Sequence, residues 1–284
     1  MSYPIEEILE MNKFSHLHDG ERIFFCKTDY IQTIANVPSA FDITSSIPHD
    51  VILITGNSDH VIDDRHVRNK PQNVIKWFCG NKHSQSDELT IIPIGVENSV
   101  KCKIGIEHGY VWDHAPEKHK ILSELRPKEP TKLVYANFTV CPSSRHASRS
   151  EWKSIALESD HITWSEGDLK YAEYCDHILD HEAVLCPLGN IHVPENDNHR
   201  IYEVLYAGRI PIIHQQELYK KLYHKYPVIL IPTDEKDTPR FDIIKDEKFM
   251  RSEIDRVKST KYDDKYLKFS YWKDLILSEK EKLN

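Results

Sequence analysis

Glycine is scarce in this sequence: only nine occur among 284 residues, against a usual share of about 7%. None of the six cysteines forms a C-x-x-C pair, which favours reduced, partly buried thiols in a reducing compartment. No apolar run approaches the ~20 residues that a membrane-spanning helix needs. The sequence starts with an acidic, amphipathic stretch, "MSYPIEEILEMNKF", which is not the pattern of a signal peptide. These absences predict a soluble, cytoplasmic protein.

Positive charge is also in deficit, and the common nucleotide-binding loops are missing. The formal net charge of -8 argues against sequence-independent nucleic-acid binding, which depends on neutralising phosphates. Neither G-x-x-x-x-G-K-[ST] nor G-x-G-x-x-G occurs, so the common NTPase and dinucleotide-binding classes are disfavoured. A G-x-S-x-G elbow is absent too, which argues against an α/β-hydrolase.

Apolar runs of strand length alternate with helical stretches through most of the chain. This alternation is typical of parallel sheets built from right-handed βαβ units. The charged, proline-containing stretch "RPKEPTK" predicts a boundary between a domain of residues 1–128 and a domain of residues 129–284. We expect strands in 21–27, 50–56, 73–78, 89–95, 132–138, 182–188, 209–214 and 226–232, and helices in 29–37, 117–126, 148–157, 200–207, 216–225 and the tail from 262. In such sheets, ligands bind beyond the carboxyl ends of the strands.

The stretch "HRIYEVLYAGRIP" predicts a short helix that begins near Arg200 and ends at Gly208. A helix N-terminus offers free N–H groups, and Arg200 adds a bidentate donor for phosphate. Glu203 lies one turn further on the same face and can accept ribose hydroxyls. The alternative is a surface pair worth only about 0.2–0.5 kcal/mol, with Gly208 as a helix C′ residue.

The segment "CPLGN…HRIYEVLYAGRIPII" resembles the donor-binding signature of exostosin-type glycosyltransferases. In that pattern C-P-x-G at a strand end is followed by R-x-x-E-x-L-x-x-G-x-I-P-I. The matching residues are Cys186, Pro187, Gly189, Arg200, Glu203, Leu205, Gly208, Ile210 and Pro211. Weaker similarity extends upstream over about two-thirds of the chain, through "YANFTVCPSSRHASR", "IPIGVEN" and "VILITGNSD". The resemblance implies an α/β protein of GT-B type, with two Rossmann-like, doubly wound domains facing a cleft and the C-terminal helix returning to the first domain.

The resemblance also implies an activity: inverting transfer of a sugar, with xylose favoured, from a UDP-sugar to a glycan hydroxyl. The donor would be held by Arg200, Glu203, Gly189 and Asn190, and by Arg145 or Arg149 in the loop "SSRHASR". No D-x-D triplet occurs, so we expect metal independence. Members of the family usually carry a membrane anchor; unanchored ones occur in bacteria and large algal viruses. Two alternatives stay open: a sugar-nucleotide epimerase or phosphorylase on the same frame, and a non-catalytic glycan-binding module.

An inverting transfer needs a carboxylate or an imidazole to take the proton of the acceptor hydroxyl. Asp59, which follows the strand expected at 50–56, ranks first, then Asp29, then His18. Each aspartate could instead cap a helix. His177 and His181 are four residues apart, a spacing that can share a metal, but they lack the glutamate of H-E-x-x-H. We interpret this pair as an exposed helix face and predict no metal site.

Overall fold

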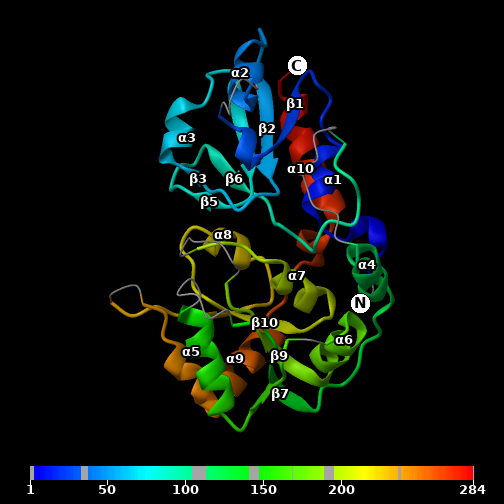
Figure 1. Cartoon of the computed structure of the whole chain (residues 1–284), viewed down its shortest axis with the longest axis vertical. Coiled ribbons are helices and arrows are strands. Elements are labelled where there is room, and N and C mark those ends of the chain that lie inside the picture. Colours follow the sequence, from blue (N-terminus) through cyan, green and yellow to red (C-terminus); the bar gives the residue numbers. More distant parts are fainter. Residues whose placement is uncertain are drawn as a thin grey trace. The chain divides into compact units, whose positions relative to one another are not determined.

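The computed structural model describes residues 3–32, 38–103, 113–140, 147–167, 169–188, 195–235 and 238–283. The chain divides into two compact units (Figure 1). The N-terminal unit consists of Pro4–His119, Glu195–His199 and Asp264–Asn284, and the C-terminal unit of Met1–Tyr3, Lys120–Pro194 and Arg200–Asp263. Among the described residues, no helix is both long and apolar enough to span a membrane.

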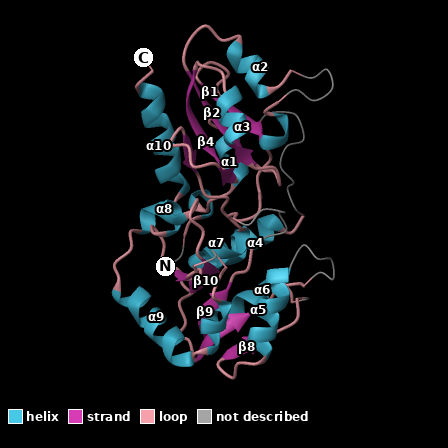
Figure 2. Ribbon diagram, turned by 90° about the vertical axis from the view of Figure 1, so that its left-hand side faces the viewer, coloured by secondary structure: helices cyan, strands magenta, loops and turns pink. Residues whose placement is uncertain are grey.

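The N-terminal unit contains a four-stranded parallel sheet in which the strands follow one another in chain order, β1-β2-β4-β6. Connections of one direction and one hand place their helices on the same face, and Figures 1 and 2 show α2 and α3 together on one face of this sheet. The described elements are η1 (Ile5–Glu7), α1 (Met11–Ser15), β1 (Ile23–Lys27), η2 (Thr28–Tyr30), α2 (Ala40–Ser45), β2 (Val51–Gly56), β3 (Ile62–Asp63), α3 (Asp64–Asn69), β4 (Val74–Cys79), β5 (Lys82–His83), β6 (Leu89–Ile91), η5 (Asp264–Leu267) and α10 (Phe269–Glu281). Helix α4 (Ala115–Glu124) contains the division between the units.

The second face of this sheet is covered by α1 and α10, which come from opposite ends of the chain (Figure 1). The Phe14 ring of α1 lies edge-on to Phe269 of α10, with centroids 5.2 Å apart. Trp272 and Ile276 of α10 are buried. On the α2 face, Phe41 packs against Trp77. The C-terminal helix therefore belongs to the N-terminal unit.

The C-terminal unit contains a five-stranded parallel sheet of order β11-β10-β9-β7-β8. The order reverses at β7, so helices cover both faces, with α5 and α9 on one and α6 and α7 on the other (Figure 1). The elements are β7 (Lys132–Ala136), α5 (Ala147–Leu157), β8 (Ile162–Trp164), α6 (Tyr171–Asp180), β9 (His181–Leu185), α7 (His199–Tyr206), β10 (Ile210–His214), α8 (Lys220–Tyr223), β11 (Ile229–Ile231), η4 (Phe241–Lys245) and α9 (Glu247–Ser259). This sheet is doubly wound, as expected, whereas the described strands of the N-terminal sheet show no reversal.

Two predicted helices differ from the structure. Of the helix expected over 29–37, residues 33–37 lie outside the described residues, and Thr28–Tyr30 form a 3-10 turn; helix α2 begins at Ala40, where Ser39 and Asp42 form a capping box. The helix expected over 216–225 is reduced to Lys220–Tyr223, since the chain first turns with the Tyr219 amide N–H donating to the Gln216 carbonyl. The other predicted strands and helices are present, but the strands expected over 89–95 and 226–232 are reduced to Leu89–Ile91 and Ile229–Ile231. The tail forms η5 first, and its helix, α10, begins only at Phe269.

Candidate functional site

The reversal of strand order in the C-terminal unit creates a switch point between β7 and β9. Chains leave neighbouring strands in opposite directions at such a point, and ligands of α/β proteins bind in the crevice beyond the carboxyl ends there. Asn137 directly follows β7, and Cys186 to Leu188 directly follow β9. A ligand at this switch point would therefore meet the side chains that contact these two strand ends.

Arg200 reaches the end of β7 from the first turn of α7. Its guanidinium Nη1 donates hydrogen bonds to the Asn137 carbonyl and, over 3.1 Å, to the Tyr174 hydroxyl. The guanidinium carbon also lies 5.3 Å from the centre of the Tyr174 ring. Burial alone would lower the pKa of Arg200, but Tyr174, Cys186 and Glu203 outweigh it and raise the pKa. Arg200 is thus a fixed cation at the switch point.

Arg149 reaches the end of β9 from α5. Its Nε and Nη2 donate to the Leu188 carbonyl over 2.9 and 2.7 Å, and its Nη1 donates to the Thr139 carbonyl over 3.1 Å. Burial, followed by the charge of Arg200, lowers the pKa of Arg149 to about 10. The two cations are therefore close enough to repel each other, and both remain charged at neutral pH.

The arrangement is suited to an anion. Arg149 and Arg200 donate these hydrogen bonds to uncharged oxygen atoms, namely backbone carbonyls and the Tyr174 hydroxyl. The charge of Arg200 lowers the pKa of Arg149, so a negative group beside Arg149 would stabilise its cation. Guanidinium is the side chain best shaped to hold phosphate oxygens in pairs. The switch point thus has the chemistry of a phosphate or diphosphate site.

Glu203 is buried on α7, with 5% of its surface exposed. The interpretation of Arg200 and Glu203 as an exposed surface pair is therefore wrong. The charge of Glu203 affects two neighbouring tyrosines. Burial raises the pKa values of Tyr171 and Tyr174, and Glu203 raises both further. The carboxylate thus lies in the same polar cluster as Arg200.

Helix α7 ends at Tyr206 in a Schellman motif. The amide N–H of Gly208 donates to the Leu205 carbonyl, and that of Arg209 donates to the Val204 carbonyl. Gly208 has φ +70°, the left-handed conformation that glycine adopts without strain. The predicted C′ role of Gly208 is confirmed. Three other predicted donor-site residues, Arg145, Gly189 and Asn190, lie outside the described residues.

The carboxylates proposed as bases lie in the N-terminal unit, at the carboxyl ends of the neighbouring strands β1 and β2. Asp29 lies in η2, with its Oδ2 3.4 Å from Lys27 Nζ and its Oδ1 3.8 Å from His60 Nε2. Burial would raise the pKa of Asp29, but Ser58 and Lys27 lower it. Asp59 is exposed in the bend after β2.

Neither aspartate is a helix cap. The N-cap of η2 is Lys27, and the next helix after Asp59 is α3, which Asp63 caps by accepting from the Arg65 and His66 amides. The cap alternative is therefore wrong for both. His18 serves β1 itself, because its Nδ1 accepts the Phe25 amide N–H over 3.3 Å.

The turn that carries Asp59 is held by two asparagines with left-handed backbones, Asn57 (φ 53°) and Asn81 (φ 49°). The Asn57 side chain donates to Asn12 Oδ1 over 2.5 Å, and the Asn81 side chain donates to the Ser58 carbonyl. Non-glycine residues with such backbones are uncommon and concentrate at functional loops. No local sequence pattern predicts this support, because Asn12 lies far away in the chain.

His177 and His181 do not form the exposed helix face that the sequence suggested. Helix α6 ends at Asp180, and His181 is buried as the first residue of β9. The Tyr135 ring stacks on His177, with centroids 5.3 Å apart, and lies 5.1 Å from His181. Both imidazoles thus pack around a strand tyrosine. Within the described ranges, no group of three potential metal ligands occurs.

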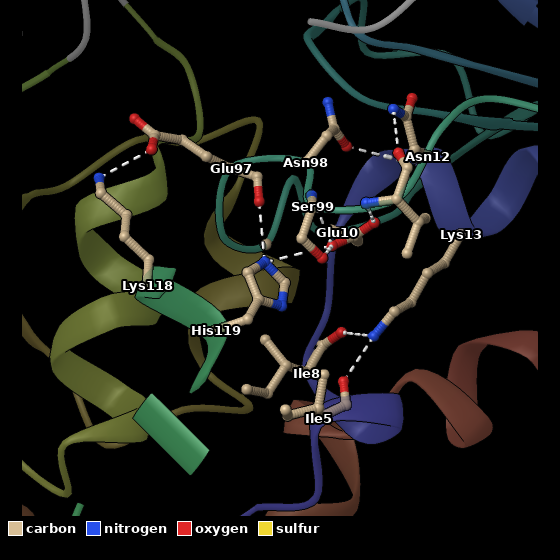
Figure 3. A network of polar contacts seen from close by, with 12 residues as sticks. Ile5, Ile8, Glu10, Asn12, Lys13, Glu97, Asn98, Ser99, Lys118 and His119 are labelled. Carbon is tan, nitrogen blue, oxygen red and sulfur yellow. Dashed lines mark hydrogen bonds and ion pairs between the residues drawn. The ribbon is translucent and has the colours of Figure 1, made fainter. Parts of the chain in front are cut away.

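A buried network in the N-terminal unit escaped the sequence analysis (Figure 3). Glu10 is fully buried and accepts hydrogen bonds from the Ser99 amide (2.9 Å), the Ser99 hydroxyl (2.6 Å) and the Val100 amide (3.0 Å). His119 Nε2 lies 3.2 Å from Glu10 Oε2 and 2.8 Å from the Glu97 carbonyl. Every partner is distant in sequence from Glu10, so no local motif announces the network. Its oxygens are satisfied from within the unit, which indicates a structural role.

No model of a known protein family matches the chain. No curated protein matches it either. The resemblance to exostosin-type glycosyltransferases therefore depends on the motif residues themselves.

Proposed function

We propose that this chain is an inverting glycosyltransferase of GT-B type that moves a sugar, with xylose favoured, from a UDP-sugar to a glycan hydroxyl. The observation that carries the proposal is the pair of guanidiniums, Arg149 and Arg200, at the β7/β9 switch point. Charge develops on the diphosphate as the sugar leaves, and two fixed cations stabilise that charge without a metal ion. The exostosin-like motif around Arg200 and Glu203 specifies the kind of anion.

The proposal gives each residue a separate role. Arg200 and Arg149 hold the diphosphate, and Glu203 accepts hydrogen bonds from the ribose. Asp59 takes the proton of the acceptor hydroxyl, with Asp29 as the second candidate. Because the diphosphate charge is met by guanidiniums, donor binding requires no divalent cation.

Calorimetric titration of UDP in the presence of EDTA tests the donor site. Arg200→Ala should weaken UDP binding about 10- to 150-fold, which corresponds to the ~1.5–3 kcal/mol of a hydrogen bond to a charged group. Arg200→Lys should retain part of the affinity, because it keeps the charge and loses the planar fork. Glu203→Gln should also weaken UDP binding, by a smaller factor.

Arg251→Ala is the matched control, since Arg251 is an exposed arginine that pairs with Glu247 on α9. Thermal unfolding of each variant separates loss of binding from loss of fold. Unchanged dissociation constants in both Arg200→Ala and Glu203→Gln would refute the donor site. A dependence of UDP binding on added Mn²⁺ would refute its metal independence.

A further inference from the structure

Gln216 is a buried amide with both ends unsatisfied. Only 2% of its surface is exposed, and within the described part of the chain neither its amide oxygen nor its amide nitrogen has a hydrogen-bond partner. A buried primary amide in this condition costs stability, so it calls for a group that completes it. Its neighbour Gln215 differs, because the Gln215 amide donates to the Glu217 carboxylate.

The backbone places Gln216 at the same sheet edge as the two arginines. The Gln215 amide N–H donates to the Ile231 carbonyl over 2.8 Å, so the ladder between β10 and β11 continues one residue past His214, and Gln216 follows directly. On the other side of β10, the Cys186 amide donates to the Ile212 carbonyl. The ends of β7, β9 and β10 therefore lie side by side at the carboxyl edge.

The separation fits a nucleotide. Neighbouring strands lie about 4.8 Å apart, so the end of β10 is roughly 10 Å from the end of β7. This is the order of distance between the diphosphate and the base of an extended nucleoside diphosphate. Helix α7, which carries Glu203, follows β9 and precedes β10 in the chain.

We propose that Gln216 recognises the base of the nucleotide donor. A carboxamide offers a donor and an acceptor side by side, which complements a base edge such as that of uracil, where N–H and C=O groups adjoin. This inference rests on the proposed donor site at Arg149 and Arg200, and it adds a second, uncharged contact that determines specificity for the base.

The experiment titrates two probes, UDP and inorganic pyrophosphate, into the full chain by calorimetry. Gln216→Leu should weaken UDP binding about tenfold or more and leave pyrophosphate binding unchanged, because pyrophosphate has no base. Arg200→Ala should weaken both probes. Gln215→Leu makes the same substitution one residue earlier, and UDP binding should be unaffected. The melting temperature of Gln216→Leu should equal or exceed that of the wild type, since leucine removes an unsatisfied buried amide.

Several results would overturn the inference. Unchanged UDP affinity in Gln216→Leu makes the amide a structural group only. If Gln216→Leu loses the same factor of affinity for UDP and for pyrophosphate, the effect does not come from recognition of the base. Gln216→Glu, which keeps the shape and removes the amide donor, provides the same test if the leucine variant does not fold. If the wild type binds UDP but Arg200→Ala changes the affinity for neither probe, both the proposed donor site and the base assignment are wrong. If Arg200→Ala weakens both probes but the Gln216 variants bind UDP normally, only the base assignment is wrong.

Discussion

At the scale of single residues, the two candidate bases, Asp59 and Asp29, differ in the surroundings of their carboxylates. Lys27 and His60 lie near the two carboxylate oxygens of Asp29. Burial would raise the pKa of Asp29, but the contacts with Ser58 and Lys27 outweigh burial and lower it. A carboxylate stabilised in its ionised form is a weaker proton acceptor. Asp59 is exposed in a turn fixed by Asn57 and Asn81. These surroundings favour Asp59 over Asp29.

We therefore expect Asp59→Asn to lower kcat about 10²–10⁴-fold, the usual contribution of a general base. Asp29→Asn should have a smaller effect, and UDP affinity should stay unchanged in both variants because the proposed donor residues are Arg149, Arg200 and Glu203. The measurement is release of UDP from a UDP-sugar with a glycan acceptor present. A near-normal kcat in Asp59→Asn would transfer the role to Asp29.

At the scale of elements, two glycines share one backbone conformation in different surroundings. Gly95 and Gly208 both have φ +70°. A Cβ added at Gly95 would lie 2.2 Å from the Leu9 carbonyl oxygen, whereas a Cβ at Gly208 would meet nothing within 4 Å. The first glycine permits a close approach of two backbones, and the second only ends a helix.

This pair gives a controlled prediction. Gly208→Ala should reduce the free energy of unfolding by about 1–2 kcal/mol, the cost of a left-handed L-residue. Gly95→Ala should pay that cost and also displace the Leu9 backbone, so its loss should be clearly larger. Urea unfolding of both variants measures the difference. Equal losses would mean that the contact with Leu9 relaxes freely.

Local patterns explain why some elements were predictable and others were not. The buried parallel strands are continuous apolar runs, and β2 is buried along its whole length, so each could be located from the sequence. Strand β8 was missed because, unlike the equally short β6 and β11, it does not lie in a longer apolar run. Helix α2 was not predicted, because its six residues, Ala40–Ser45, are too few for a helical period to stand out.

The candidate site was predictable to the same extent. The alternation of strands and helices put Arg149 and Arg200 after strand ends, and the motif identified Glu203. The contacts of Arg200 with Asn137 and Tyr174 join residues 63 and 26 positions apart, and no local pattern encodes such pairs. Gln216 stood inside an expected helix, and only the observed burial of its unsatisfied amide distinguishes it.

At the scale of the whole molecule, acid should destabilise the protein in two stages. Burial lowers the pKa values of His18, His119 and His181 below the ordinary 6.5. Below about pH 6.5 these histidines bind protons in the unfolded chain more readily than in the folded chain. The free energy of unfolding therefore falls as the pH drops below about 6.5. Burial would raise the pKa of Asp63, but Arg65 and His66 hold it at about 2. Such carboxylates add a second loss as the pH falls below their ordinary 3.8.

His119 allows the first stage to be tested. Its side chain is 1% exposed, its Nε2 faces Glu10 and the Glu97 carbonyl, and Lys13 is the nearby cation that lowers its pKa further. Within its window it contributes a slope of up to about 1.4 kcal/mol per pH unit. Urea unfolding between pH 5 and 8 should show a smaller slope for His119→Gln than for the wild type. His224→Gln, at an exposed position, should retain the wild-type slope; an equal slope in all three proteins would contradict the assignment.

The sequential strand order of the N-terminal sheet also has a consequence for biosynthesis. Its α2 face is completed as soon as β6 leaves the ribosome, but the opposite face, with the buried side chains of Ile52, Ile54 and Phe78, receives α10 only after residues 92–268 have been translated. At ~5–20 residues per second this interval is on the order of ten seconds or more. During that time α1 alone covers part of this face, so we expect the nascent chain to expose apolar sheet surface. Truncations that remove α10 should therefore reduce the soluble yield.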